Sequence, residues 1–155
     1  MNEPTIEVFH GRTIANRLLT YLAATRPAFL TASILPVLVA GALVHALKGD
    51  VSAPLLMLAV LGIALIHGGA NVLNDYFDGL SGNDERNTAR VFPFSGGSRF
   101  IQNSVLSLRE TRNLGVLLMA SGAALGIAMV WLTGPLLLAL GLLGGVVAVT
   151  YSAPP

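Results

Sequence analysis

The chain has 155 residues, of which 54% are hydrophobic and only 11% are charged. So few charges cannot cover the exterior of a water-soluble domain, and the composition therefore indicates an integral membrane protein. The net charge of +1 excludes the broad basic surface on which nucleic-acid binding depends, and the absence of cysteine excludes disulfides and thiolate metal sites.

The first 26 residues carry scattered charges, such as Glu7 and Arg17, before any long apolar run. This segment lacks the basic start and apolar core of a cleavable signal peptide. We therefore expect residues 1–26 to form a cytoplasmic N-terminal segment. The remainder, residues 27–155, is expected to be part of one transmembrane domain.

Four apolar runs follow, and a polar stretch at 74–113 separates the second from the third. A run of about twenty residues is long enough to cross the hydrocarbon core of a bilayer as a helix. The predicted fold class is therefore all-α, a polytopic transmembrane helical bundle with four spans in this chain. The spans are expected at about 27–47, 53–73, 114–133 and 135–151, of which the last is the shortest.

Basic residues predict the orientation of these spans. Three arginines precede the first span, one lysine separates the first two, and five arginines lie between the second and third. Cytoplasmic loops are enriched in lysine and arginine, so we expect the amino terminus and the loop 74–113 to be cytoplasmic. The chain stops directly after the fourth apolar run, from which we expect a truncated polypeptide.

Four polar side chains stand at the end of the second span, at positions i, i+3, i+4 and i+7. This spacing places them on one face of a helix. Carboxylate and amide oxygens gathered in this way suit a hard cation such as Mg²⁺, which combines few carboxylates with water and phosphate oxygens. A single polar residue here is explained more simply as the place where the span meets water. Four such residues on one face, so close to lipid, favour a functional site. They are Asn71, Asn74, Asp75 and Asp78.

Asp84 lies beyond this helix. A loop through Gly82 is expected to fold Asp84 back toward the stripe, where it would bind a second cation, and both cations would bind one diphosphate group. The loop from Arg90 to Arg99 reads RVFPFSGGSR, and its two arginines and paired glycines suit a lid over an anion. A generic flexible loop explains the same letters equally well.

Two further residues have two interpretations each. Arg26 is expected either to reach the same cation site at the membrane surface or to anchor the chain to lipid headgroups. His67 lies one turn before the polar stripe, where a helix-packing role is favoured over substrate binding or proton transfer.

The segment Asn71–Asp84, read as NVLNDYFDGLSGND, resembles the first Asp-rich motif of UbiA-type intramembrane aromatic prenyltransferases. The gap from Asp78 to Asp84 is similar to the 1,4-dihydroxy-2-naphthoate branch of that family. Further similar features are Arg26-Pro27 with Pro36, the Ser95–Arg99 loop, and the closing Tyr-Ser-Ala-Pro-Pro at 151–155.

The resemblance implies a bundle of about nine spans, of which this chain supplies four. It implies transfer of an isoprenyl chain from a polyprenyl diphosphate to a small aromatic acceptor, 1,4-dihydroxy-2-naphthoate in menaquinone biosynthesis, with Mg²⁺ as cofactor. The membrane would be that of a bacterial or archaeal cell. A second Asp-rich motif is absent, so the chain alone is expected to be inactive. By the resemblance, Asn74, Asp78 and Asp84 are catalytic and hold the metal, and Asn71, Asp75, Arg90, Arg99 and Arg26 bind the diphosphate.

Other classes fit the residues less well. CDP-alcohol phosphotransferases need an Asp-Gly-x-x-Ala-Arg opening, which is not met at Asp78-Gly79, and the EF-hand spacing is also missing. An ion-coupled transporter fragment would use the polar stripe as a cation site, although such sites normally lie near the bilayer midplane. In a purely structural membrane subunit the stripe would be incidental.

Overall fold

The computed structural model describes residues 3–9, 13–91 and 95–152. Within these ranges the chain forms helices and no strands, which confirms the predicted all-α fold class. In chain order the helices are α1 (Ile6–Phe9), α2 (Ile14–Ala24), α3 (Pro27–Lys48), α4 (Ala53–Ser81), α5 (Asn83–Arg86), α6 (Leu108–Thr133) and α7 (Leu136–Ser152).

Three helices, α3, α4 and α6, are long and apolar enough to cross a membrane, with mean hydropathies of 2.1, 2.0 and 2.0. In the most apolar stretch of each helix, at most 17% of the residues are buried within the protein, so most of this surface is left for lipid. The fourth expected span forms α7, whose 17 residues extend about 26 Å, at the short end of the range that crosses a bilayer.

Helix bounds differ from the expected spans at the polar end. Helix α4 continues past residue 73 to Ser81, and α6 begins at Leu108, so only part of the stretch 74–113 is a loop. The extension of α4 ends at Gly82, which has φ +71. Helix α6 begins early because Ser107 and Glu110 form a capping box, each side chain accepting the other's backbone N–H.

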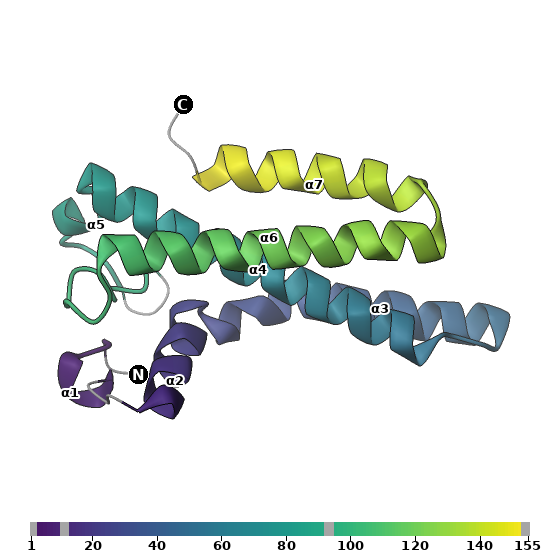
Figure 1. Ribbon diagram of the computed structural model, residues 1–155, viewed down its shortest axis with the longest axis horizontal. Coiled ribbons are helices and arrows are strands. Elements are labelled where there is room, and N and C mark those ends of the chain that lie inside the picture. The colour runs from purple at the N-terminus through teal and green to yellow at the C-terminus, as the bar shows by residue number, and fades with distance from the viewer. Residues whose placement is uncertain (1–2, 10–12, 92–94, 153–155) are drawn as a thin grey trace.

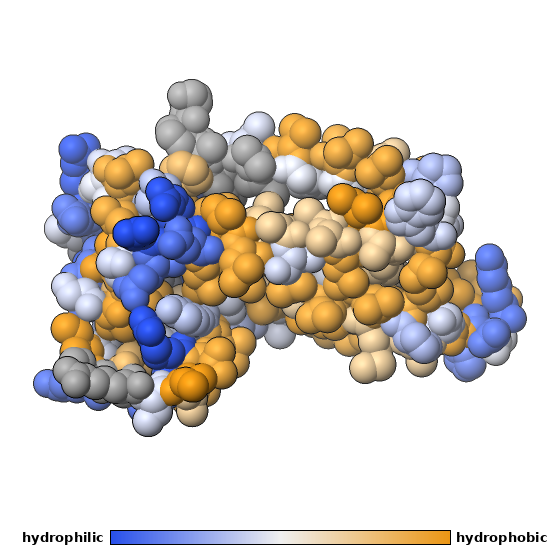
Figure 2. Space-filling view, viewed as in Figure 1, coloured by the Kyte–Doolittle hydropathy of each residue, from blue (hydrophilic) through white to orange (hydrophobic). Residues whose placement is uncertain are grey.

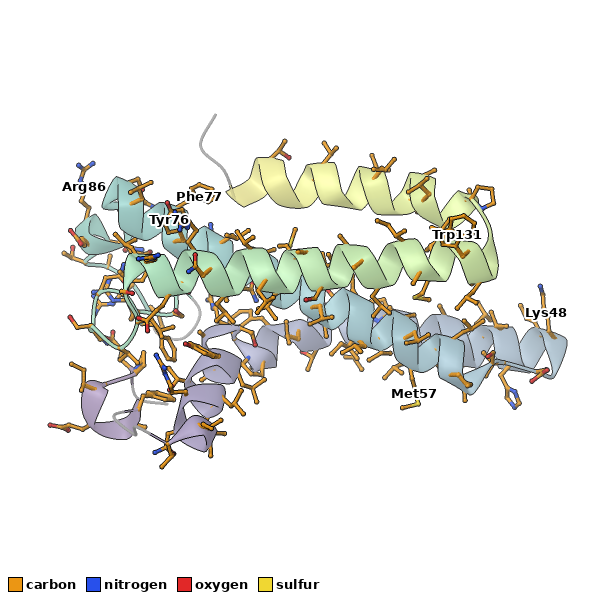
Figure 3. All side chains as sticks on the ribbon, in the orientation of Figure 1. Lys48, Met57, Tyr76, Phe77, Arg86 and Trp131 are labelled. Carbon is orange, nitrogen blue, oxygen red and sulfur yellow. The ribbon has the colours of Figure 1, made fainter. Side chains whose placement is uncertain are left out.

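The helices α3, α4, α6 and α7 run along the long axis of the molecule, while α1, α2 and α5 gather at one end (Figure 1). Polar residues are concentrated at that end, with apolar residues covering the middle (Figure 2). Arg86 marks the polar end and Lys48 the opposite tip (Figure 3). We refer to the end that carries α5 as the polar end.

Helices α4 and α6 pack closely because glycines face larger side chains across their interface. A Cβ at Gly115 of α6 would lie 2.7 Å from Leu73 Cγ of α4. A Cβ at Gly122 would lie 2.8 Å from Ile66 Cδ1, and one at Gly69 would lie 2.9 Å from Met119 Cγ. Small residues at such contacts let two membrane helices approach, as the many glycines of the third span suggest.

A small hydrophobic core holds the polar end together. It consists of Ala24 from α2, Val72 from α4, and Phe100 and Leu106 from the segment before α6, all at most 5% exposed. The Phe9 ring packs against Phe100 with centroids 5.1 Å apart. This core fixes the loop 95–107 against the end of α4, where the polar stripe lies.

Candidate functional site

Asp75 is the most buried member of the polar stripe on α4. Its residue is 4% exposed, and its Oδ1 accepts the backbone N–H of Ser98 at 3.1 Å. Ser98 is itself 5% exposed. The amide directly after the glycine pair is therefore bound by a carboxylate of the protein, which ties the loop to α4.

Gly97 lies between two carboxylates. A Cβ at this position would lie 3.0 Å from Asp84 Cγ and 3.1 Å from Asp75 Oδ1. Gly97 also has φ +72, a left-handed conformation that favours glycine. The lack of space and the left-handed backbone at this position both favour glycine. Since the carboxylates of Asp75 and Asp84 both lie close to Gly97, they lie close to one another.

Asp84 lies on the short helix α5 and is 3% exposed. Its backbone carbonyl accepts a hydrogen bond from Arg99 Nη1 at 2.9 Å. Burial raises the pKa of the Asp84 carboxyl, and the negative charge of Asp78 raises it further. The positive charges of Arg99, Arg26 and Arg90 act in the opposite direction. The pKa of Asp84 therefore responds to the charge of Asp78 and to all three candidate arginines.

The arginines hold different positions around this carboxylate. Arg90 pairs with Glu3, whose Oε1 accepts hydrogen bonds from Arg90 Nε at 3.1 Å and Nη2 at 2.7 Å. The pair lowers the pKa of the Glu3 carboxyl. Arg99 has a left-handed backbone with φ 67, and its buried Nε has no hydrogen-bond partner among the described residues. Arg26 also has a left-handed backbone, and its guanidinium lies 4.5 Å from the centre of the Phe29 ring.

Other members of the stripe make separate contacts. Asn71 Nδ2 donates to the Thr25 carbonyl at 3.0 Å, so this side chain links α4 to the end of α2. Asp78 Oδ1 accepts from Asn83 Nδ2 at 3.0 Å. Asn74 is half-buried on the same helix. The stripe therefore spreads over several partners, and Asp75 and Asp84 are the carboxylates that meet at Gly97.

An apolar pocket of about 640 Å³ lies against the loop residues Gly97 and Ser98, which contact the carboxylates from its other side. Leu19 and Leu22 of α2 line it together with Phe29 of α3 and Phe100. Gly97, Ser98 and Arg26 also contribute to its wall, so the pocket and the carboxylates share the same loop.

Residues 33–154 match the sequence profile of the UbiA prenyltransferase family. The chain belongs to this family. It is 27% identical over 109 residues to UbiA prenyltransferase domain-containing protein 1 of Danio rerio, which covers 70% of this chain and 30% of the relative. It is 30% identical over 108 residues to the homolog in Drosophila melanogaster, with 68% and 28% covered. A comparison with solved structures finds no match.

The chain spans about 30% of the length of the curated relatives that it matches. Membership of the UbiA family favours a transferase over the transporter alternative. Both relatives are animal proteins, and they therefore give no support to the expected bacterial or archaeal membrane.

Among the described residues, no group of three or more His, Cys, Asp or Glu side chains is arranged to hold a metal ion. Magnesium in UbiA-type chemistry does not require such a group, because it is commonly held by one or two carboxylates together with waters and substrate phosphates. Asp78 and Asp84 fit that donor set, since the negative charge of Asp78 raises the pKa of the Asp84 carboxyl and a bound cation would compensate both charges.

Sequence reasoning alone missed several residues of this site. Glu3 pairs with Arg90 across 87 positions, and Ser98 reaches Asp75 across 23, so no local spacing announces either contact. His67 Nδ1 lies 2.8 Å from Ser33 Oγ of α3, which agrees with the helix-packing interpretation. The expected residues Phe92, Pro93 and Phe94 of the loop, and 153–155 of the closing segment, lie outside the described ranges.

Proposed function

We propose that the full-length protein transfers an isoprenyl chain from a polyprenyl diphosphate to a small aromatic acceptor. The observation that carries this proposal is the setting of Asp84, a buried carboxylate whose backbone carbonyl accepts a hydrogen bond from Arg99 and whose pKa responds to the charges of Asp78 and three arginines. This mixed set stands at the polar end of an apolar bundle. A diphosphate with a metal ion satisfies both signs of charge there, and an isoprenoid tail suits the apolar surroundings.

In this proposal Asn74, Asp78 and Asp84 hold Mg²⁺ against the diphosphate. Magnesium, when bound, would compensate the charge of the departing diphosphate, so that the allylic carbon can become electron-poor before the aromatic ring attacks. Asn71 and Asp75 would steady the same region of α4.

The arginines would act on the diphosphate directly. Arg99 is the best supported, because within the part of the chain that the structure describes its buried Nε has no hydrogen-bond partner, and its Nη1 already contacts the Asp84 backbone. Arg90 would have to exchange its pairing with Glu3 for a phosphate oxygen. Arg26 lines the pocket next to the loop.

The acceptor that we propose is 1,4-dihydroxy-2-naphthoate, whose prenylation is a step of menaquinone biosynthesis. It is supported by the resemblance of the spacing from Asp78 to Asp84 and of the loop 95–99 to that branch. The arginine count supports a cytoplasmic position for the polar end.

The test uses the full-length protein in detergent or vesicles, with Mg²⁺ and an isoprenyl diphosphate titrated while aromatic alkylation is followed. We expect Asp78→Ala to lower turnover about a hundredfold, as when one charge-stabilising group is removed from an active site. Asp50→Ala is the matched control, because Asp50 is an exposed carboxylate next to Lys48 at the far tip. Equal turnover in Asp78→Ala and Asp50→Ala would exclude the assigned role.

A further inference from the structure

Helix α2 turns two large apolar side chains away from the rest of the protein, whereas Leu19 and Leu22 line the apolar pocket. Ile14 and Leu18 are 80% and 61% exposed, and their spacing of four residues places them in one stripe along the helix. The buried residues of the same helix are Thr20 and Ala24, at 5% and 2% exposed. A helix bordered by water on its outer side would carry the opposite pattern.

Contacts near both ends hold α2 in this orientation. Arg17 Nη2 lies 3.4 Å from Glu110 Oε1 at the start of α6, and the Thr25 carbonyl accepts a hydrogen bond from Asn71 of α4. Ala24 packs into the core of the polar end. The outward direction of the stripe is therefore set by contacts from two other helices.

The position of α2 relative to the membrane follows from α3. The left-handed backbone of Arg26 separates the two helices, and α2 leaves the polar end at a steep angle to the long axis that α3, α4 and α6 follow (Figure 1). When α3 crosses the bilayer, α2 therefore lies close to the plane of its surface. The buried Thr20 and Ala24 face the rest of the protein, and the exposed stripe of Ile14 and Leu18 faces outward.

We propose that α2 is an interfacial helix whose stripe, Ile14 and Leu18, inserts into the bilayer leaflet at the polar end of the bundle. The occupant of this surface is lipid, because α2 ends at Ala24 and the membrane-length helix α3 starts at Pro27, which keeps α2 at the membrane surface. Such helices lie in the interface with their apolar face at the boundary between headgroups and acyl chains.

The test uses full-length protein in phospholipid vesicles, with any cysteine outside residues 1–155 replaced by serine, since this sequence has none. Leu18→Cys carries an environment-sensitive fluorophore, and a fraction of the lipids carries a nitroxide near the start of the acyl chain. We expect the nitroxide lipids to lower the Leu18 emission at least about twofold, since an interfacial helix sits at this depth.

Two matched variants complete the test. Ile14→Cys, on the same stripe, is expected to respond like Leu18→Cys. Thr88→Cys, an exposed position after α5 at the polar end, is expected to keep its emission and to be quenched by iodide in water. Leu18 emission that iodide lowers and lipid does not would overturn the proposal in favour of a water-facing helix. Emission that neither quencher lowers would overturn it in favour of cover by another protein segment or a second copy.

Discussion

The two halves of α4 are held by different kinds of contact. Along its apolar half, Gly69 and Ile66 meet Met119 and Gly122 of α6, where shape alone decides the fit. Beyond Leu73, the same helix also faces the loop before α6, and the buried Asp75 carboxylate accepts the backbone N–H of Ser98 there. One helix therefore serves as a rigid membrane element at one end and as the wall of a polar site at the other.

Because the contacts differ, substitutions in the two halves of α4 are expected to affect different properties of the protein. Close-packed helices lose stability when volume is added, because the surrounding side chains already sit in contact. The polar end instead depends on keeping charges at set positions, and its buried carboxylates oppose folding until they are compensated. We therefore expect substitutions in the apolar half to affect stability, and those at the polar end to affect activity.

The largest effect on stability is expected for a substitution that disrupts the packing of α6 on the apolar half of α4. Gly115→Leu places a side chain where even a Cβ would lie 2.7 Å from Leu73 Cγ, and we expect a loss of stability of about 3 kcal/mol, at the upper end for overpacking. The control is Gly126→Leu in the same helix, where a Cβ would meet no atom within 4 Å. Thermal unfolding in detergent measures both. Equal melting temperatures for the two variants would show that α4 and α6 do not pack as described.

A smaller effect on stability, with a larger one on activity, is expected at Gly97→Ala. Its methyl group would press on Asp84 and Asp75, and its φ of +72 adds strain of about 1–2 kcal/mol. Gly49→Ala is the matched control, with φ +74, no atom within 4 Å of the added carbon, and a place at the far tip. We expect a lower melting temperature for Gly97→Ala than for Gly49→Ala, because only the carbon added at Gly97 meets other atoms, and at least tenfold lower prenyl transfer, because displaced charges stabilise a transition state poorly. Equal activities would contradict a role for this contact.

Much of the membrane half could be predicted from the sequence, since a run of apolar residues and its length are local properties. Glycines at Gly115 and Gly122 likewise announce close helix packing. The end of α4 was harder, because polarity marks the limit of a span and not the limit of a helix. Residues from 74 to Ser81 are polar enough to leave the membrane and still continue the helix.

The site was predicted only as a set of candidates. The helical spacing of Asp75 and Asp78 is visible in the sequence, but the partner of each depends on how the loop returns. Asp75 bonds to Ser98, while Asp78 bonds to Asn83, although the two carboxylates are three residues apart. Contacts of this kind follow from the core around Phe100, which no local pattern encodes.

The smallest expected effect sharpens the electrostatic side of the comparison, at the pair between Glu3 and Arg90. Because the folded protein lowers the pKa of Glu3 below its ordinary value of 4.5, the pair stabilises the fold above that pH and loses this effect as the pH falls through the folded pKa. Glu3→Gln should therefore cost at most about 1 kcal/mol at neutral pH, since the pair is partly exposed, and nothing in strong acid. Unfolding measured from pH 7 to pH 3 tests this, with Glu3→Gln repeated in an Arg90→Gln background, where no cost is expected. A cost that stays constant with pH, or that persists without Arg90, would mean that Glu3 stabilises the polar end through packing and not through charge.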